Sequence, residues 1–284
     1  SPDPATPGSV EFVTNAQIPH IDDVNFTGSS GESFIGITPL FGVGKGSGNT
    51  ATFDMRAGGD NLFFASTAKS PGGGEFHYIA GDGDDTLAFR AKLAYFSGEA
   101  TFDMTAGGRN VLFAGEQVAN SSGSFSYEGG AGTDIIALGN ESLQTATTVA
   151  VDMSEGGTNL LRGSSYLSYS SPFNYTGGPG RDMVIADEYV GSYSTADFDM
   201  QAGGNNLLIM DDYIAYSGVV SYTGGSGTDN IVGKYDIGGA LVVDLSQGGD
   251  NLFVAGTAQE RIDFKAGPDA DTFVLLEEMG LTGS

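Results

Sequence analysis

The fold is decided by a short unit whose clearest copy is Ser126–Leu138, with the sequence Ser-Tyr-Glu-Gly-Gly-Ala-Gly-Thr-Asp-Ile-Ile-Ala-Leu. The unit consists of the end of a strand, a glycine-rich turn, an aspartate and an apolar strand. Glycine suits the turn because it adopts positive φ angles without steric cost. Similar units recur along the chain and centre on Asp85, Asp182, Asp229 and Asp271.

A second version of the unit, Phe-Asp-Met-x-Ala-Gly-Gly-x-Asn-x-Leu with small changes, alternates with the first. It centres on Asn61, Asn110, Asn159, Asn206 and Asn251. We call these asparagines and the central aspartates the marker residues. They recur about every 23 residues. Val24–Ile35 fits the same pattern with Ser33 at the marker position, and terminal repeats are commonly atypical.

The residues around each marker favour strands over helices. Phe, Tyr, Val, Ile and Leu occur there in short runs interrupted by glycine. A single coil of this kind cannot bury its apolar side alone, so coils must stack on one another. We therefore predict an all-β protein, a parallel β-solenoid (β-roll or β-helix) of about 11 coils of about 23 residues. Residues 1–24 are expected to be an N-terminal extended segment and cap, and residues 25–284 a single solenoid domain.

One apolar residue lies two positions after each marker, and stacking would place these residues in a continuous buried ladder. They are Phe63, Leu87, Leu112, Ile136, Leu161, Val184, Leu208, Ile231, Phe253 and Phe273.

The composition limits the classes of partner. The 284 residues include 36 acidic and 11 basic ones, for a net charge of −25. Nucleic acid is not an expected partner, because binding it depends on lysine and arginine contacts to phosphates. No apolar run approaches the roughly 18 residues of a membrane-spanning helix, so membrane insertion is not expected. Divalent cations are the natural counter-charge, and oxygen ligands suit calcium. We expect a secreted, extracellular or cell-surface location.

The nine residues Gly129–Ala137 resemble the Gly-Gly-x-Gly-x-Asp-x-U-x nonapeptide of RTX, or haemolysin-type calcium-binding, repeats, in which U is a large apolar residue. The segments 177–185 and 224–232 match every defined position as well. The resemblance implies a β-roll that binds Ca²⁺ between the turns of successive coils. The carboxylates that it assigns to the metal are Asp82, Asp84, Asp85, Asp134, Asp182, Asp229, Asp269 and Asp271.

The alternation of the two units departs from the RTX pattern, in which the nonapeptides run in tandem. Asp134 is predicted to stack between Asn110 and Asn159. An asparagine amide can donate a hydrogen bond to a carboxylate, so the five marker asparagines would form a structural ladder with the aspartates without a metal. Both interpretations of the turns remain open. If calcium binds, Asp82–Asp85 is the most favourable turn because its carboxylates are crowded.

One group of residues suggests catalysis. Asp54, His77 and Asp103 are predicted to point outward from the first strands of successive coils and to be stacked neighbours. A histidine between carboxylates can serve as a general base, and parallel β-helix enzymes carry acid–base groups on such a face. The alternative is that His77 fills an ordinary exposed position, which serine occupies in other coils. The aspartates of this row are expected mostly in alternate coils, about 10 Å apart.

Tyrosines cluster in the variable segments of neighbouring coils. They either form a strip for a partner or a glycan or pack over the corner of the solenoid. They are Tyr166, Tyr169, Tyr189, Tyr193, Tyr213 and Tyr216.

The expected function is that of a non-enzymatic structural protein at the cell surface or outside the cell. Unpaired strands at the ends of a solenoid are templates for further pairing, so copies are expected to associate head to tail or laterally. The product would be an extracellular layer, sheath, filament or adhesive matrix, with calcium dependence if the turns bind the ion. The alternatives are a carbohydrate-active parallel β-helix enzyme resembling polysaccharide lyases or epimerases, and a module that binds a cell-surface polysaccharide.

Overall fold

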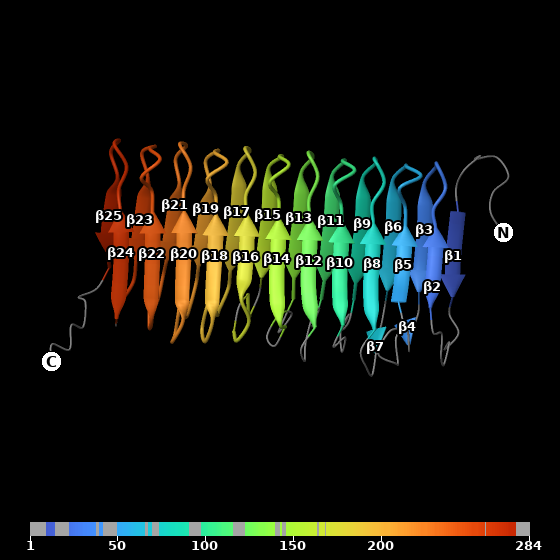
Figure 1. The fold of residues 1–284 in the computed structure, drawn as a ribbon, viewed down its shortest axis with the longest axis horizontal. Coiled ribbons are helices and arrows are strands. Elements are labelled where there is room, and N and C mark those ends of the chain that lie inside the picture. Colours follow the sequence, from blue (N-terminus) through green and yellow to red (C-terminus); the bar gives the residue numbers. More distant parts are fainter. Residues whose placement is uncertain are drawn as a thin grey trace.

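The computed structural model confirms the predicted all-β parallel solenoid (Figure 1). It describes residues 10–14, 23–37, 40–41, 50–65, 68–69, 74–90, 98–115, 123–139, 143, 146–163, 165–167, 169–258 and 260–276. Within these ranges the chain forms strands and turns and no helix, so no helix there could cross a membrane. Successive coils lie side by side along one long axis, from β1 at one end to β25 at the other.

One of the two large sheets, which we call the marker sheet, contains twelve strands among the described residues. Most of its strands begin at a marker residue or directly after one, and neighbouring strands pair in parallel. They are β1 (Val10–Thr14), β3 (Ser33–Ile37), β6 (Asn61–Ala65), β9 (Asp85–Phe89), β11 (Asn110–Ala114), β13 (Asp134–Leu138), β15 (Asn159–Gly163), β17 (Asp182–Ala186), β19 (Leu207–Met210), β21 (Asn230–Gly233), β23 (Leu252–Ala255) and β25 (Thr272–Leu275).

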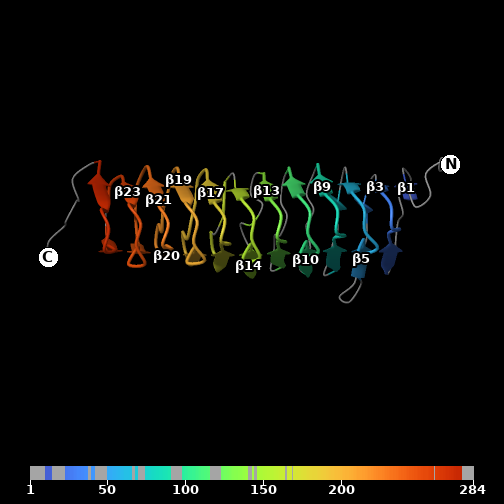
Figure 2. The same cartoon turned by 90° about the horizontal axis from the view of Figure 1, so that it is seen from above.

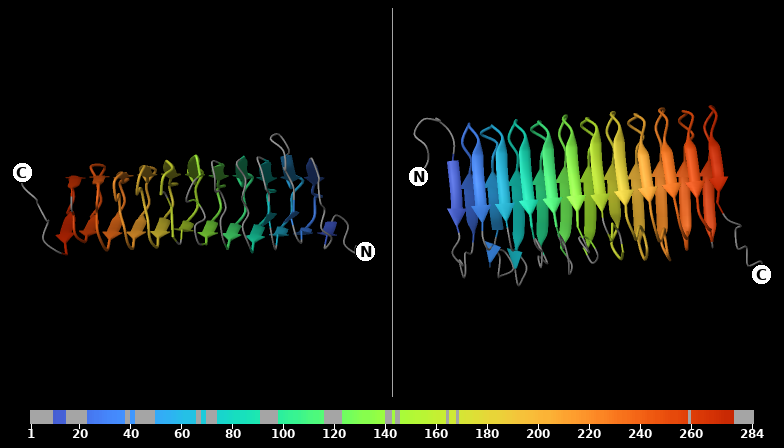
Figure 3. Two further views of the ribbon diagram at one scale, coloured as in Figure 1. Left: turned by 90° about the horizontal axis from the view of Figure 1, so that it is seen from below. Right: turned by 180° about the vertical axis from the view of Figure 1, so that it is seen from behind.

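The second sheet, which we call the facing sheet, contains eleven strands in the same part of the chain. Each comes directly before the turn that leads to a strand of the marker sheet, and the two sheets form separate layers (Figures 2 and 3). They are β2 (Val24–Thr27), β5 (Thr50–Asp54), β8 (Glu75–Ile79), β10 (Glu99–Asp103), β12 (Ser124–Glu128), β14 (Thr148–Asp152), β16 (Phe173–Thr176), β18 (Thr195–Asp199), β20 (Val219–Thr223), β22 (Ala240–Asp244) and β24 (Arg261–Lys265). A short pair, β4 (Leu40–Phe41) and β7 (Ala68–Lys69), forms a third sheet.

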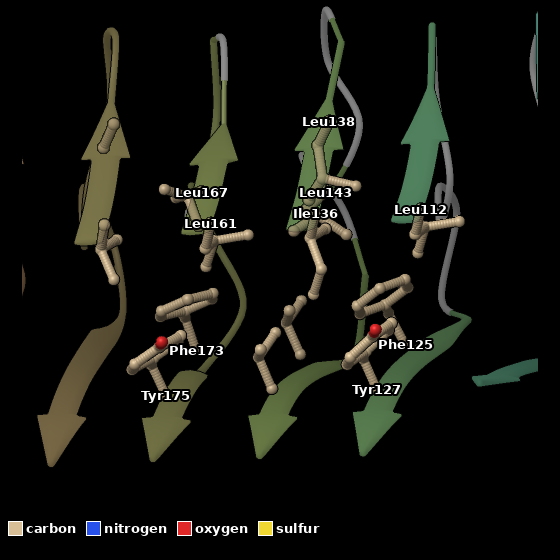
Figure 4. Close-up of a cluster of buried hydrophobic side chains, with 14 of the residues drawn as sticks. Leu112, Phe125, Tyr127, Ile136, Leu138, Leu143, Leu161, Leu167, Phe173 and Tyr175 are labelled. Atoms are coloured by element: carbon tan, nitrogen blue, oxygen red, sulfur yellow. The ribbon is translucent and has the colours of Figure 1, made fainter. Parts of the chain in front are cut away.

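The core fills the space between the two layers. The predicted apolar ladder of the marker sheet is confirmed: its residues pair in register from Phe63 to Phe273. Its members from Phe63 to Phe253 are fully buried, whereas Phe273 in the last coil is 40% exposed. Aromatic residues of the facing sheet, such as Phe125 and Tyr127, project toward the same space (Figure 4).

The register of the facing sheet differs from the predicted one, and the stacking of Asp54, His77 and Asp103 was wrong. His77 pairs with threonines of both neighbouring strands, whereas Asp54 and Asp103 both pair with Ile79. The cause is the number of aromatic residues in each strand. β5 has one, Phe53, whereas β8 has two at alternate positions, and Phe53 pairs with the second of them, Tyr78. Aligning the strands by their first aromatic residues therefore shifts them by two.

The corrected register also changes the outward carboxylates. Glu128 lies between Asp103 and Asp152, so three carboxylates follow one another in consecutive strands. Asp103 and Asp152 lie in alternate coils as predicted, but Glu128 occupies the position between them. Strands of one sheet lie about 4.8 Å apart, so like charges are closer here than expected.

Close stacking of the turns depends on glycine. A Cβ atom on Gly132 would overlap the carbonyl oxygen of Gly108 in the preceding coil, and the same holds for Gly180 against Gly157. These glycines are needed because no side chain fits between the backbones of consecutive turns.

The variant Gly132→Ala should therefore lose stability. We expect its free energy of unfolding to fall by at least about 1–3 kcal/mol, since the clash is with backbone that cannot rotate away. Denaturant unfolding followed by circular dichroism measures this. Ala131→Ser, at an exposed position of the same turn, is the control and should change the value by less than about 0.5 kcal/mol. Equal stabilities of the two variants would contradict the role of Gly132.

Candidate functional site

The marker residues form one hydrogen-bonded column along the start of the marker sheet, and asparagine and aspartate alternate in it. Each asparagine donates from Nδ2 to Oδ1 of the aspartate in the following coil. The contacts are Asn61–Asp85 at 2.6 Å, Asn110–Asp134 at 2.9 Å, Asn159–Asp182 at 2.8 Å, Asn206–Asp229 at 2.9 Å and Asn251–Asp271 at 2.8 Å.

The column continues across the remaining junctions and into the turns. The backbone N–H of Asp134 donates to Oδ1 of Asn159 at 3.0 Å, and three other aspartates make the same contact. The second carboxylate oxygen, Oδ2, accepts from a glycine N–H four residues earlier, as from Gly130 at 3.1 Å. Asn159 Nδ2 also donates to the carbonyl of Gly156 in its own turn at 2.8 Å. Each aspartate is thus held by N–H donors from its own and adjacent coils.

Burial is the dominant influence on these carboxyl groups. Loss of water raises the pKa of Asp85, Asp182 and Asp229 to about 6, although the hydrogen bonds from asparagine and glycine act in the opposite direction. Burial raises the pKa of Asp134 as well. Asp85, Asp182 and Asp229 therefore take up protons just below neutral pH, where an ordinary aspartate is ionised.

Sequence reasoning missed a set of tyrosines next to this column. Tyr127 is fully buried and donates its hydroxyl to Asp134 Oδ1 at 3.2 Å. The same position, seven residues before the marker aspartate, holds Tyr78, Tyr175 and Tyr222, which are also fully buried. The corresponding position of the asparagine coils holds phenylalanine or valine, such as Phe102. The sequence could have identified these tyrosines, because this position holds tyrosine only in the coils whose marker is aspartate.

The donor set of the column does not fit calcium. Ca²⁺ takes six to eight oxygen ligands, whereas the oxygens of these aspartates receive N–H groups, whose positive ends disfavour a cation. Among the described residues, no group of three or more His, Cys, Asp or Glu side chains converges to hold a metal. The geometry fits the metal-free interpretation of the ladder.

The remaining carboxylates assigned to calcium by the resemblance also bind backbone N–H groups. Asp82 Oδ1 accepts from Gly59 of the preceding coil at 3.3 Å, while Asp84 Oδ1 accepts from Arg109 of the following coil at 2.7 Å. Asp269 Oδ2 accepts from Gly249 at 2.9 Å. Asp82 and Asp84 thus face opposite ends of the solenoid and do not converge on one point.

His77 is separated from the predicted carboxylates. Its Nε2 lies 3.4 Å from Glu75 Oε2 on the same strand, and its side chain is 26% exposed. Arg56 forms an ion pair with Asp54 at 2.6 Å instead. The geometric basis for a general base flanked by Asp54 and Asp103 is therefore missing.

The predicted tyrosines do lie together, at the corner where the chain leaves the marker sheet. One column consists of Tyr166, Tyr189 and Tyr213, stacked with centroid distances of 4.9 and 5.1 Å. A second column consists of Tyr169, Tyr193 and Tyr216, whose rings meet edge to face at 5.1 and 5.7 Å. Between the columns lies a hollow, which we call the tyrosine groove.

The outward side of the marker sheet from β3 to β25 is almost entirely apolar, and we call it the apolar face. The exceptions in these strands are Gly36, Thr86, Arg162, Asn230 and Thr272, and Arg162 is paired with Asp187 at 3.0 Å. Phe113 and Leu62 are 49% and 40% exposed there. The apolar members are Phe34, Leu62, Phe64, Ala88, Val111, Phe113, Ile135, Ala137, Leu160, Met183, Ile185, Leu207, Ile209, Val232, Leu252, Val254 and Val274.

The outward side of the facing sheet is polar and acidic, and we call it the acidic face. Serine and threonine alternate there with carboxylates, and the few cations form ion pairs, such as Lys265 with Asp244 at 2.9 Å. The carboxylates are Asp54, Glu75, Glu99, Asp103, Glu128, Asp152, Asp197, Asp199, Asp244 and Asp263.

No protein-family model, curated protein or solved structure matches this chain.

Replacing one ladder asparagine tests whether stability depends on the alternation of asparagine and aspartate. Asn110→Asp removes the donor to Asp134 and places a second carboxylate beside it, so we expect a loss of at least about 2–3 kcal/mol at pH 7.5. Ca²⁺ should recover part of that loss, while neither Ca²⁺ nor a chelator should shift the melting temperature of the wild type. Asn205→Asp, at an exposed turn position where other coils carry Asp60 and Asp250, is the control. A chelator-sensitive wild type would contradict a metal-free ladder.

The raised pKa values determine how stability depends on pH. In the native state Asp85, Asp182 and Asp229 hold protons up to about pH 6, whereas the ordinary pKa of an aspartate is 3.8. Their contribution to stability is complete below pH 3.8 and is lost as the pH rises through about 6. We therefore expect a higher melting temperature at pH 5 than at pH 7.5.

Asp182→Asn provides the control for this pH dependence. Asparagine does not titrate, so the difference in melting temperature between the two pH values should shrink in this variant. Measurements in 0.5 M salt reduce the contribution of exposed charges and leave that of buried ones. A wild type that is equally stable at both pH values in high salt would show that these carboxyls do not control stability.

Proposed function

We propose that the protein is a non-enzymatic structural component outside the cell or at its surface, and that copies associate through the apolar face. One observation carries the proposal: the outward side of one sheet is mostly apolar, whereas that of the other is mostly polar and acidic. A continuous apolar surface on a protein with a net charge of −25 needs a partner that covers it.

A second copy of the chain fits this surface. Pairing two apolar faces leaves both acidic faces in water and keeps most of the negative charge away from the contact. The sheets would pack about 10 Å apart, as stacked sheets do. A partner that presented the acidic face instead would bury unpaired carboxylates, which is costly.

The size of the apolar face is sufficient for such a contact. Eleven strands spaced by about 4.8 Å extend for roughly 50 Å, and two rows of side chains make the face about 10 Å wide. Each copy would then bury about 500 Å², and the pair about 1,000 Å², which is near the lower limit for a specific interface.

A longer assembly needs a second contact, because face-to-face pairing of identical surfaces closes at two copies. The last coil offers one: Phe273 and Leu276 are 40% and 57% exposed there. Stacking of this end on the first coil of another copy is head to tail and does not close, so it produces a filament. Pairs of rods joined end to end would suit a sheath, layer or adhesive matrix.

The alternatives are less well supported. A polysaccharide lyase or epimerase was suggested by stacking of Asp54, His77 and Asp103, and the register separates these residues. The calcium dependence suggested by the RTX resemblance has no converging ligand set among the described residues. Assembly of the proposed kind needs no metal in the ladder.

A matched pair of variants tests the pairing. Ala88 lies on the apolar face between Phe64 and Phe113, and Ala150 lies on the acidic face between Ser126 and Asn174. Ala88→Asp would bury an unpaired charge in the contact, so we expect association at least tenfold weaker, whereas Ala150→Asp should behave as wild type.

Sedimentation velocity and negative-stain electron microscopy over a range of protein concentrations measure this association. Both variants should retain the circular dichroism spectrum of the wild type, since neither side chain points into the core. A wild type that stays monomeric at every concentration would refute the proposal, and equal weakening by both substitutions would refute the assignment to the apolar face.

A further inference from the structure

The tyrosine groove is a hollow of about 320 Å³ lined by six tyrosines and Ser192. It lies at a corner between the sheets, so an inference about it does not depend on pairing through the apolar face. Tyr193 and Tyr216 are 53% and 49% exposed, so aromatic surface faces the solvent here. The groove spans three consecutive coils.

The backbone beneath the groove is held in place by buried residues. Leu167, Val190 and Ile214 each follow a tyrosine of the stacked column and are almost fully buried. Their N–H groups donate to the next coil, as from Val190 to the carbonyl of Tyr213 at 3.1 Å. Ala215 has a φ of 50°, which costs a non-glycine residue on the order of 1 kcal/mol. The corner is thus a rigid support that holds a strained residue.

The chemistry of the lining is uncharged and rich in hydroxyl groups. Ser192 is fully buried at the floor of the groove, and its Oγ has no hydrogen-bond partner. A buried hydroxyl without a partner is unfavourable, and a ligand hydroxyl or a water bound with it would satisfy it. Among the residues that the structure describes, no charged side chain lines the groove.

Carboxylates lie around the groove. Burial and the neighbouring tyrosines raise the pKa of Tyr189, and the charges of Asp212 and Glu188 act in the same direction. Asp187 and Asp211 are nearby in sequence and paired with Arg162 and Lys234. An anionic ligand would be repelled by these groups and by the net charge of −25.

We propose that the tyrosine groove is a binding site for an uncharged polysaccharide whose chain runs along the solenoid axis. Tyrosine offers an apolar ring for the C–H face of a sugar and a hydroxyl for its polar edge. The tyrosines repeat once per coil, at the spacing of about 4.8 Å between strands, which is comparable to the length of one sugar in an extended glycan. One chain can therefore meet equivalent residues in successive coils.

Two other ligand classes fit the groove less well. A quaternary ammonium group is best held by several ring faces that surround it, and the stacked rings of Tyr166, Tyr189 and Tyr213 cover one another's faces. A sugar needs only one open ring, which the exposed Tyr193 or Tyr216 supplies. A proline-rich peptide docks in aromatic grooves but offers the unpartnered hydroxyl of Ser192 mainly carbonyl acceptors, whereas a sugar hydroxyl can both donate to it and accept from it.

Affinity electrophoresis and tyrosine fluorescence test the proposal. The chain has 12 tyrosines and no tryptophan, so its intrinsic fluorescence reports on tyrosine directly. The probes are hydroxyethyl cellulose, galactomannan and soluble starch as uncharged polymers, and alginate as the anionic one. We expect retardation and a fluorescence change with at least one uncharged polymer and none with alginate.

Three variants make the assignment specific. Tyr193→Ala and Tyr216→Ala should each weaken binding about tenfold, because each removes an exposed ring of the groove. Tyr235→Ala is the matched control, since Tyr235 is 51% exposed but lies outside the groove, and it should bind as wild type. Thermal melts should show that all three are folded.

Several results would overturn the proposal. These are no binding of any uncharged polymer, binding that Tyr193→Ala and Tyr216→Ala leave unchanged, or equal loss in Tyr235→Ala. Binding of poly-L-proline or choline in place of the polymers would assign the groove to a different ligand class. None of these results bears on association through the apolar face, which sedimentation measures separately.

Discussion

The hydrogen bond between an asparagine amide and an aspartate carboxylate of the next coil is the interaction on which this fold depends. A solenoid places equivalent residues of successive coils directly above one another, so a buried polar position is repeated many times. In a column made only of carboxylates, neighbouring negative charges would repel each other. In a column made only of amides, an NH2 group would replace one carboxylate oxygen, and an N–H donor such as that of Gly130 or Asn110 would lose its acceptor. Alternation gives each buried aspartate a donor, at 2.9 Å between Asn110 and Asp134, and leaves no carboxylate adjacent to another in the column. The glycine turns allow this because they bring consecutive backbones close together.

Much of the fold could be predicted from the sequence, because equivalent residues of successive repeats pair with one another in a solenoid. The marker sheet follows from the spacing of Asn61, Asp85 and their equivalents, which also places Phe63 above Leu87 in the core. The facing sheet could not be predicted in the same way. Its strands are tied to the markers through turns of two lengths, and the number of aromatic residues differs between strands: β8 and β12 have two at alternate positions, whereas β5 and β10 have one. The choice between them is made by three-dimensional packing, which pairs Phe53 with Tyr78.

The candidate sites show the same division. The six corner tyrosines could be grouped from the sequence because they occur at related places in neighbouring coils. Their arrangement as a stacked and an edge-to-face column could not, because the variable segments differ in length. The apolar face was not recognised from the sequence, because inward and outward positions are both apolar in these strands, as at Ile135, Ile136 and Ala137. Apolar residues on both sides of a strand usually indicate burial on both faces, which is the situation that pairing of two copies would create.

The alternating column also restricts how the length of the protein can change. Deletion or duplication of a single internal coil would bring two asparagines or two aspartates together at the junction. Two neighbouring asparagines would leave an amide donor without its carboxylate acceptor, whereas two neighbouring aspartates would bury carboxylates side by side. An insertion or loss of two coils preserves the order of donor and acceptor at every level. The pair of coils is therefore the unit by which this solenoid can lengthen or shorten, and a related rod of different length is expected to differ by whole pairs of coils.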